Sequence, residues 1–155
     1  MNKPKVLFLC TGNSCRSQMA EGWARRLLGD RIEPYSAGVK THGMNPSAIK
    51  VMAEAGVDIS EKAGYRSKHV DELRHVPLDY VVTVCDNANE TCPAFPGKVK
   101  RLHVSFDDPP RLAKDAKSEE EALGHYRRVR DEIRGFIESL EERLAGEGQG
   151  NTGAR

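Results

Sequence analysis

The sequence lacks an excess of charge of either sign. Its 155 residues include 24 lysines and arginines and 23 aspartates and glutamates, which gives a formal net charge of +1. This balance creates no overall field that would gather nucleic acid or an anionic membrane around the protein. We therefore expect neither partner, and any anion site must arise from local features of the chain.

A long apolar stretch is also missing near the N-terminus. Residues 1–5 are mostly polar, and the short apolar run that follows is too short for a signal peptide or a membrane span. We expect a cytoplasmic protein. Its length suits one domain, which we predict over residues 1–145, followed by a small, polar, disordered tail over 146–155.

Only four cysteines are present: Cys10, Cys15, Cys85 and Cys92. Because cytoplasmic thiols stay reduced, these residues indicate catalysis, redox chemistry or metal binding rather than a disulfide framework. There is no Cys-x2-Cys pair, and the five histidines are scattered, so we interpret them as surface or capping residues rather than ligands. We predict no metal and no cofactor.

Predicted strands and helices alternate along the chain. Apolar or β-branched runs predict strands over residues 6–9, 78–84 and 99–104. Helical spacing of apolar residues predicts helices over 19–28, 46–56 and 118–145, the last with a capping box at Ser118 and Glu121. This order predicts an α/β fold: a single doubly wound domain with a mostly parallel central sheet flanked by helices. Such sheets bind ligands at the carboxyl ends of their strands, where Cys10 and Cys85 are expected.

A thiol, five intervening residues and an arginine lie between the first predicted strand and helix. Loop N–H groups and a helix N-terminus attract a tetrahedral anion, and the Arg16 guanidinium offers two donors in one plane. These positive surroundings favour the nucleophilic thiolate of Cys10. We predict an oxyanion site formed by Thr11, Gly12, Asn13, Ser14, Cys15, Arg16 and Ser17.

Other interpretations of this loop have less support. A nucleotide phosphate loop requires a Gly-Lys-Ser/Thr ending, which is absent. Cys10 by itself fits a small buried residue at a strand end equally well, but the complete pattern with Arg16 favours a nucleophile. The Cys15 side chain has no distinct role in the pattern, and we interpret it as a packed thiol.

Residues 10–23, together with Tyr35, Ser36, Ala37 and Gly38, resemble the low-molecular-weight tyrosine phosphatase superfamily, and more closely its thioredoxin-coupled arsenate reductase branch. The resemblance covers nearly the whole chain through the C-terminal helix. It implies that Cys10 attacks a bound oxyanion that Arg16 holds. The implied substrate is arsenate, with phosphate or sulfate as competing oxyanions.

Residues 81–93 resemble the redox segment of that branch. The resemblance implies that Cys85 attacks Cys10 of the arsenate adduct, that Cys92 then attacks Cys85, and that thioredoxin reduces the final disulfide. Alternatively, Cys85 is a core thiol and Cys92 an incidental surface residue, and the chain is a tyrosine phosphatase. A non-catalytic oxyanion-binding or redox-sensing protein is a further alternative.

Asp107 and Asp108 precede two prolines in a segment that we predict to be a rigid loop. Expelling hydroxide or an alkoxide calls for a proton donor. The segment resembles the family's general-acid loop, in which the acid directly precedes proline, so Asp108 is favoured over Asp107. A turn without a chemical role is the alternative.

Some members of the superfamily hold a potassium ion near the oxyanion loop. Asn13 and Glu21 match two of the implied ligands. Residues 62–67, where the other ligands belong, depart from the family pattern and include an insertion relative to it. We therefore predict no potassium site.

Overall fold

A computed structural model describes residues 2–86, 95 and 97–148. Four strands form one parallel sheet in the order β2-β1-β3-β4. The strands are β1 (Lys5–Cys10), β2 (Glu33–Gly38), β3 (Tyr80–Thr83) and β4 (Lys100–His103). The predicted parallel α/β sheet is confirmed, and β1 lies at its centre because its apolar residues are buried on both faces.

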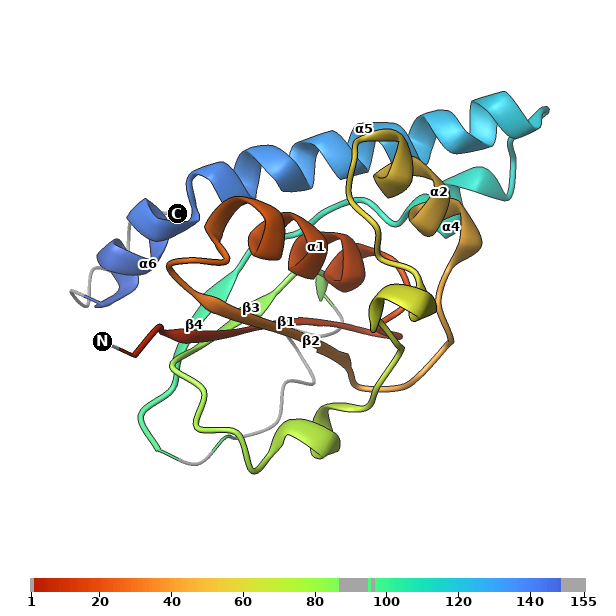
Figure 1. The fold of residues 1–155 in the computed structure, drawn as a ribbon. Helices are drawn as coiled ribbons and strands as arrows, with labels where there is room; N and C mark the ends of the chain where they lie inside the picture. Colours follow the sequence, from red (N-terminus) through yellow and green to blue (C-terminus); the bar gives the residue numbers. More distant parts are fainter. Residues whose placement is uncertain (1, 87–94, 96, 149–155) are drawn as a thin grey trace.

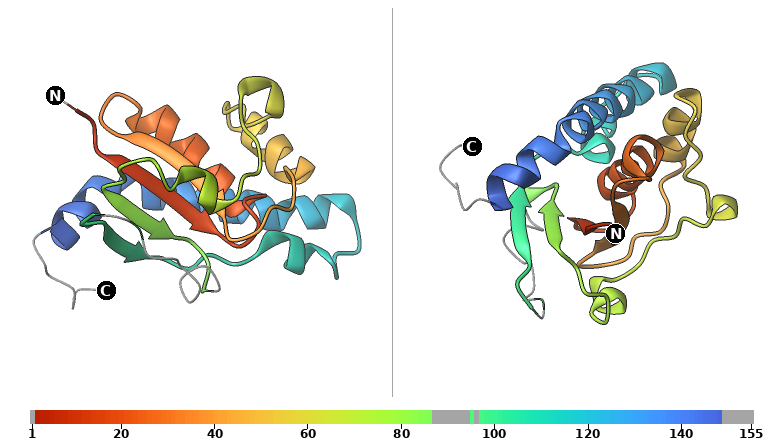
Figure 2. Two further views of the ribbon diagram at one scale, coloured as in Figure 1. Left: turned by 90° about the horizontal axis from the view of Figure 1, so that it is seen from below. Right: turned by 60° about the vertical axis from the view of Figure 1, so that its left-hand side comes forward.

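Helices cover this sheet. They are α1 (Arg16–Leu28), α2 (Pro46–Glu54), α4 (Pro109–Ala113), α5 (Glu119–Glu138) and α6 (Leu140–Gly148), with short 3-10 turns η1 (Glu61–Ala63) and η2 (Val70–Leu73). Helices α1 and α5 pack together on one side of the sheet, and η2 lies on the other (Figure 1). Two further views show the same layers (Figure 2). Within the described residues, none of the helices is long and apolar enough to cross a membrane.

The strand order places a crevice between β1 and β3. The chain leaves β1 toward β2 on one side, and β3 continues to β4 on the other. Ligands of doubly wound sheets bind outside the carboxyl ends of the strands at such a reversal. Leu9 pairs with Thr83 in the register of β1 and β3. Cys10, which ends β1, and Cys85, two residues after the end of β3, are therefore brought to the same edge.

The main differences between the predictions and the structure concern β2, Pro109 and the C-terminal helix. The strand β2 is missing from the predictions because Glu33, Pro34 and Ser36 interrupt its apolar pattern. The buried Ser36 hydroxyl is accommodated by donating to Glu21 Oε1 at 2.6 Å. The predicted rigid loop at Pro109 instead begins α4, because proline fits the first turn of a helix, where its missing N–H is not needed.

The predicted C-terminal helix is divided at Ser139. The Ser139 hydroxyl donates to the Phe136 carbonyl at 3.0 Å, and its backbone N–H also turns back to the end of α5. The apolar spacing continues across this break because Leu140 and Leu144 stay buried. Helix α6 runs to Gly148, which is past the predicted domain boundary at residue 145, and residues 149–155 of the predicted tail lie outside the described residues. The capping bond from Glu121 N–H to Ser118 Oγ is present as predicted.

Candidate active site

The loop between β1 and α1 directs a serine hydroxyl at the predicted nucleophile. Cys10 is a buried, unpaired thiol, 3% exposed, with its Sγ 3.1 Å from Ser17 Oγ. Asn13 Nδ2 donates to the same Ser17 oxygen at 2.9 Å. Because that oxygen already accepts from Asn13, the Ser17 hydrogen is available for donation to sulfur, and such a bond stabilises a thiolate.

Asn13 sets the shape of the loop. Its φ of 49° is the one positive value at a non-glycine residue in the described chain, a conformation that asparagine tolerates better than most residues. The side chain is fully buried, and its Oδ1 accepts from Gln18 Nε2 at 2.9 Å and from Lys68 N at 2.8 Å. These bonds hold the left-handed conformation in place.

Replacing Asn13 by alanine should lower the free energy of unfolding by about 1–3 kcal/mol, because alanine disfavours this φ and leaves the half-buried Lys68 N–H without its acceptor. Denaturant unfolding measures the loss. Asn13→Gly is the matched variant, since glycine accepts the conformation but also lacks the amide, and it should be the more stable of the two. Equal stability of Asn13→Ala and the wild type would contradict this account of the loop.

Close packing of the His42 ring against the loop explains the glycine at position 12. A Cβ on Gly12 would lie 2.2 Å from His42 Nδ1, so a side chain there requires His42 to move. The Gly12 carbonyl accepts from His42 N at 3.0 Å and from Ser67 Oγ at 2.9 Å. Because the Gly12 carbonyl oxygen already accepts these two hydrogen bonds, it does not compete with the loop N–H groups for contact with a bound anion.

The loop borders a cavity of about 370 Å³. Its lining includes most of the predicted oxyanion residues and three that were not predicted as site residues, His42, Asn45 and Pro110. The full set of lining residues is Cys10, Thr11, Gly12, Ser14, Cys15, Arg16, His42, Asn45, Asp108 and Pro110. His42 and Asn45 precede α2 in a segment where no motif singles them out, whereas Pro110 belongs to the general-acid segment with Asp108.

Arg16 is oriented from outside the loop. Its Nη1 donates to the Phe106 carbonyl at 2.9 Å, and its Nη2 lies 3.6 Å from Asp108 Oδ1. A guanidinium has five N–H donors, so these two contacts leave donors for a bound anion. Asp107 instead pairs with Arg128 at 3.0 Å. Of the two aspartates, Asp108 alone borders the cavity beside Cys10.

Cys85 contacts the oxyanion loop at Thr11. Its Sγ is 3.3 Å from Thr11 Oγ1, and the residue is 4% exposed. A second cavity, of about 350 Å³, is lined by Cys85 and shares Thr11, Arg16 and Asp108 with the first. The two thiols therefore border adjoining spaces. The predicted site residue Cys92 lies outside the described residues.

Cys15 differs electrostatically from a nucleophile. Burial raises the pKa of its thiol, and the neighbouring Cys10 raises that pKa further, against a smaller opposing effect of Arg16. A raised pKa keeps Cys15 in the unreactive thiol form at neutral pH. This supports the interpretation of its side chain as a packed thiol.

The two residues that match potassium ligands have protein partners. Glu21 accepts from Ser36 and pairs with Arg25 at 2.7 Å, while Asn13 Oδ1 accepts from Gln18 and the Lys68 backbone. Within the part of the chain that is described, no group of three or more His, Cys, Asp or Glu side chains is arranged to hold a metal ion.

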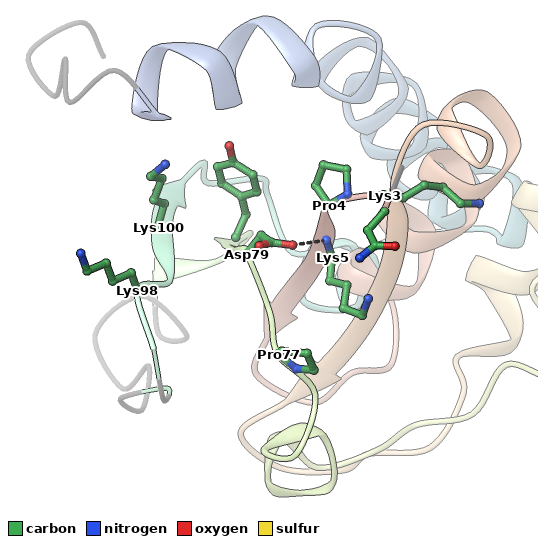
Figure 3. A pocket seen from close by; sticks show the side chains of 9 residues that line it. Lys3, Pro4, Lys5, Pro77, Asp79, Lys98 and Lys100 are labelled. Atoms are coloured by element: carbon green, nitrogen blue, oxygen red, sulfur yellow. Dashed lines mark hydrogen bonds between the residues drawn. The ribbon is translucent and has the colours of Figure 1, made fainter.

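A larger cavity, of about 430 Å³, lies at the amino ends of the strands (Figure 3). Lys3, Lys5, Lys98 and Lys100 line it, and Asp79 Oδ2 accepts from the Lys5 backbone at 2.8 Å. No thiol is among the described residues that line this cavity. It lies at the opposite end of β1 from Cys10, so the cavity that Cys10 lines is the candidate active site.

Residues 5–150 match the family described as low molecular weight phosphotyrosine protein phosphatase. The chain belongs to this family. Two relatives are arsenate reductases: that of Halalkalibacterium halodurans is 49% identical over 92% of this chain and 98% of its own, and that of Bacillus licheniformis is 52% identical over 86% of this chain and 91% of its own.

Solved structures that resemble this chain include arsenate reductases and a tyrosine phosphatase. An arsenate reductase in the phosphate binding state has a TM-score of 0.69 and 29% identity over 90% of this chain and 98% of its own. A thioredoxin-dependent arsenate reductase from Corynebacterium glutamicum has a TM-score of 0.66 and 26% identity over 94% and 63%. A low molecular weight protein tyrosine phosphatase from T. tengcongensis has a TM-score of 0.67 and 28% identity over 91% and 99%.

Proposed function

We propose that this protein reduces arsenate to arsenite, with Cys10 as nucleophile, Cys85 and Cys92 as resolving thiols, and thioredoxin as reductant. The observation that carries the proposal is the position of Cys85. Its Sγ lies 3.3 Å from a side chain of the oxyanion loop, in a cavity that adjoins that of Cys10. A phosphatase has no use for a second thiol there, whereas a reductase needs one.

The first step is the addition of Cys10 to arsenate. Arg16 and the loop N–H groups hold the anion oxygens, and the Cys10 thiolate attacks arsenic. A hydroxyl of arsenate leaves as water after it receives a proton, for which Asp108 is the donor. Asp108 lines the cavity and is only half-buried, so solvent can return its proton. The product is a covalent Cys10–arsenate adduct in which arsenic remains pentavalent.

The second step transfers two electrons. The Cys85 thiolate attacks Cys10 Sγ, the sulfur–arsenic bond breaks, and its electron pair remains on arsenic. Arsenite leaves, and Cys10 and Cys85 are joined by a disulfide. The thiols are oxidised by two electrons and arsenic is reduced by two.

The third step frees Cys10 for another cycle. The Cys92 thiolate attacks Cys85, which releases the Cys10 thiolate and forms a Cys85–Cys92 disulfide that a thioredoxin dithiol reduces. The names of the related arsenate reductases, one of them thioredoxin-dependent, support this partner. The cycle needs thiols that are kept reduced, a condition that the cytoplasm provides.

Protein tyrosine phosphatase activity is the second candidate. Cys10, Arg16 and Asp108 are arranged equally well for a phosphate ester, and a phosphatase is among the similar structures. Phosphatase side activity is compatible with the reductase, so its detection alone does not distinguish the two functions.

The decisive assay follows NADPH oxidation by thioredoxin reductase and thioredoxin in the presence of the protein and arsenate. We expect turnover that requires arsenate and thioredoxin, with release of one arsenite for each NADPH. Replacing thioredoxin by glutaredoxin and glutathione is the matched control and should give little activity. Hydrolysis of an aryl phosphate without arsenate-dependent oxidation would instead identify a phosphatase, and failure of both assays would favour a binding or sensing protein.

A further inference from the structure

The side chain of His103 connects the residues on both sides of Cys85. His103 ends β4 and pairs with Thr83 in the register of the sheet. Its Nδ1 lies 2.8 Å from the Oγ1 atom of Thr83, a residue two positions before Cys85. Its Nε2 lies 3.0 Å from the Oδ1 atom of Asp86, the residue directly after Cys85. One side chain of β4 therefore contacts the chain both before and after the Cys85 thiol.

The chemistry of imidazole suits this bridge. A neutral ring with its proton on Nε2 donates to the Asp86 carboxylate and accepts at Nδ1 from the Thr83 hydroxyl. An imidazolium donates at both nitrogens to the same two oxygens. The His103 side chain is only 31% exposed although it lies at the end of an outer strand, and the Asp86 side chain that it contacts is 75% exposed. His69 has the predicted capping role, since it accepts from Asp71 N, whereas His103 joins two segments of the chain.

We infer that His103 is a positioning residue for the Cys85 thiol. The inference rests on the proposed function, because only the reductase cycle uses Cys85. Cys85 is located by the contact of its thiol with Thr11 and by the His103 bridge between the residues before and after it. Attack on Cys10 requires the two sulfurs to come together in line with the sulfur–arsenic bond, and small errors in such placement slow a reaction strongly.

The inference predicts a selective effect of His103→Ala. Formation of the Cys10–Cys85 disulfide should slow by about 10-fold, because the chain on both sides of Cys85 loses its anchor. Binding at the oxyanion loop should be unchanged, because neither the cavity beside Cys10 nor its loop includes His103. A merely structural role would affect both properties together.

The experiment isolates the resolving step by using Cys92→Ser protein as the parent, in which the first disulfide accumulates. Arsenate is added to pre-reduced protein, the reaction is quenched with acid, and the Cys10–Cys85 disulfide is quantified by mass spectrometry against time. The rate at which iodoacetamide modifies Cys10, and its slowing by inorganic phosphate, report on the intact first site. Thermal unfolding shows that each variant is folded.

Two matched variants separate the two hydrogen bonds. His103→Gln retains a donor near the position of Nε2 and should recover much of the rate if the bond to Asp86 dominates, whereas His103→Asn retains a group near Nδ1 and tests the bond to Thr83. Asp86→Ala should slow the same step, and the double variant His103→Ala/Asp86→Ala should be no slower than the slower single variant, since both remove one bridge.

Each outcome has a distinct meaning. Slower disulfide formation with unchanged Cys10 alkylation and phosphate protection supports the inference. An unchanged rate in His103→Ala, an equal loss of oxyanion binding, or effects of His103→Ala and Asp86→Ala that multiply overturns it while leaving the proposed function intact. If the Cys92→Ser parent forms neither the disulfide nor arsenite, the proposed function and the inference both fail.

Discussion

Replacing Cys85 by serine is expected to reduce arsenite release by about 10³-fold or more, because a residue that acts in a catalytic unit is lost. The serine hydroxyl is not ionised at neutral pH and cannot form a disulfide with Cys10, so the arsenate adduct has no route to arsenite. The measurement is the quantity of arsenite produced after arsenate is mixed with pre-reduced protein. Serine is close to cysteine in size and can keep the contact with Thr11 Oγ1, so the fold should stay intact.

Cys92→Ser is the matched comparison for Cys85→Ser. It retains both thiols of the first two steps, so it should release close to one arsenite per protein and then stop, with Cys10 and Cys85 joined. Continued turnover by either variant at the wild-type rate would show that these cysteines are not resolving thiols. A phosphatase would instead release no arsenite in the wild type or in either variant, and all three proteins would hydrolyse an aryl phosphate normally.

Replacing Cys10 by serine should have the largest effect of any substitution, on the order of 10⁴-fold or more in kcat/KM, because every later step depends on the adduct at this sulfur. Arsenate reduction and any aryl phosphate hydrolysis should be lost together. The two assays measure this loss, and the binding of inorganic phosphate, followed by calorimetry, tests whether the oxyanion loop remains formed. Serine keeps the size of the side chain and its contact with Ser17.

Alkylation of the same variant provides an independent check. Wild-type protein should lose activity with iodoacetamide as Cys10 is modified, whereas Cys15 should stay unlabelled in both proteins at neutral pH because its pKa is raised by burial. Since the raised pKa lies on the alkaline side, labelling of Cys15 should appear only as the pH rises far above neutrality. Rapid labelling of Cys15 at neutral pH, or retained turnover by Cys10→Ser, would contradict the assignment of the nucleophile.

Local features of the fold could be predicted from the sequence because their causes lie within a few residues. The apolar run of β1, the helical spacing of α1 and the capping bond of Ser118 follow directly from neighbouring side chains. The prediction failed where a distant partner was decisive. Strand β2 contains a buried serine that is tolerated only because Glu21 accepts its hydrogen bond.

Helix boundaries were less predictable for a related reason. The pattern of apolar residues runs through Ser139 because residues on both sides of the break face the same core. Spacing reports which face is buried, and it does not reveal a serine that turns back to cap the preceding helix. At Pro109, proline is compatible with both a loop and the first turn of a helix, and the structure contains the helix.

By itself, the sequence determined the chemistry-bearing loop of this protein: a thiol, backbone donors and an arginine between one strand and one helix, all within residues 10–17. The tertiary structure decided which distant groups meet that loop. It placed Cys85 beside Thr11, Asp108 rather than Asp107 beside the cavity, and the His103 ring across the chain around Cys85. The physical reason is that strand order and register determine the contacts between residues far apart in the chain. The local spacing of residues predicts neither of these.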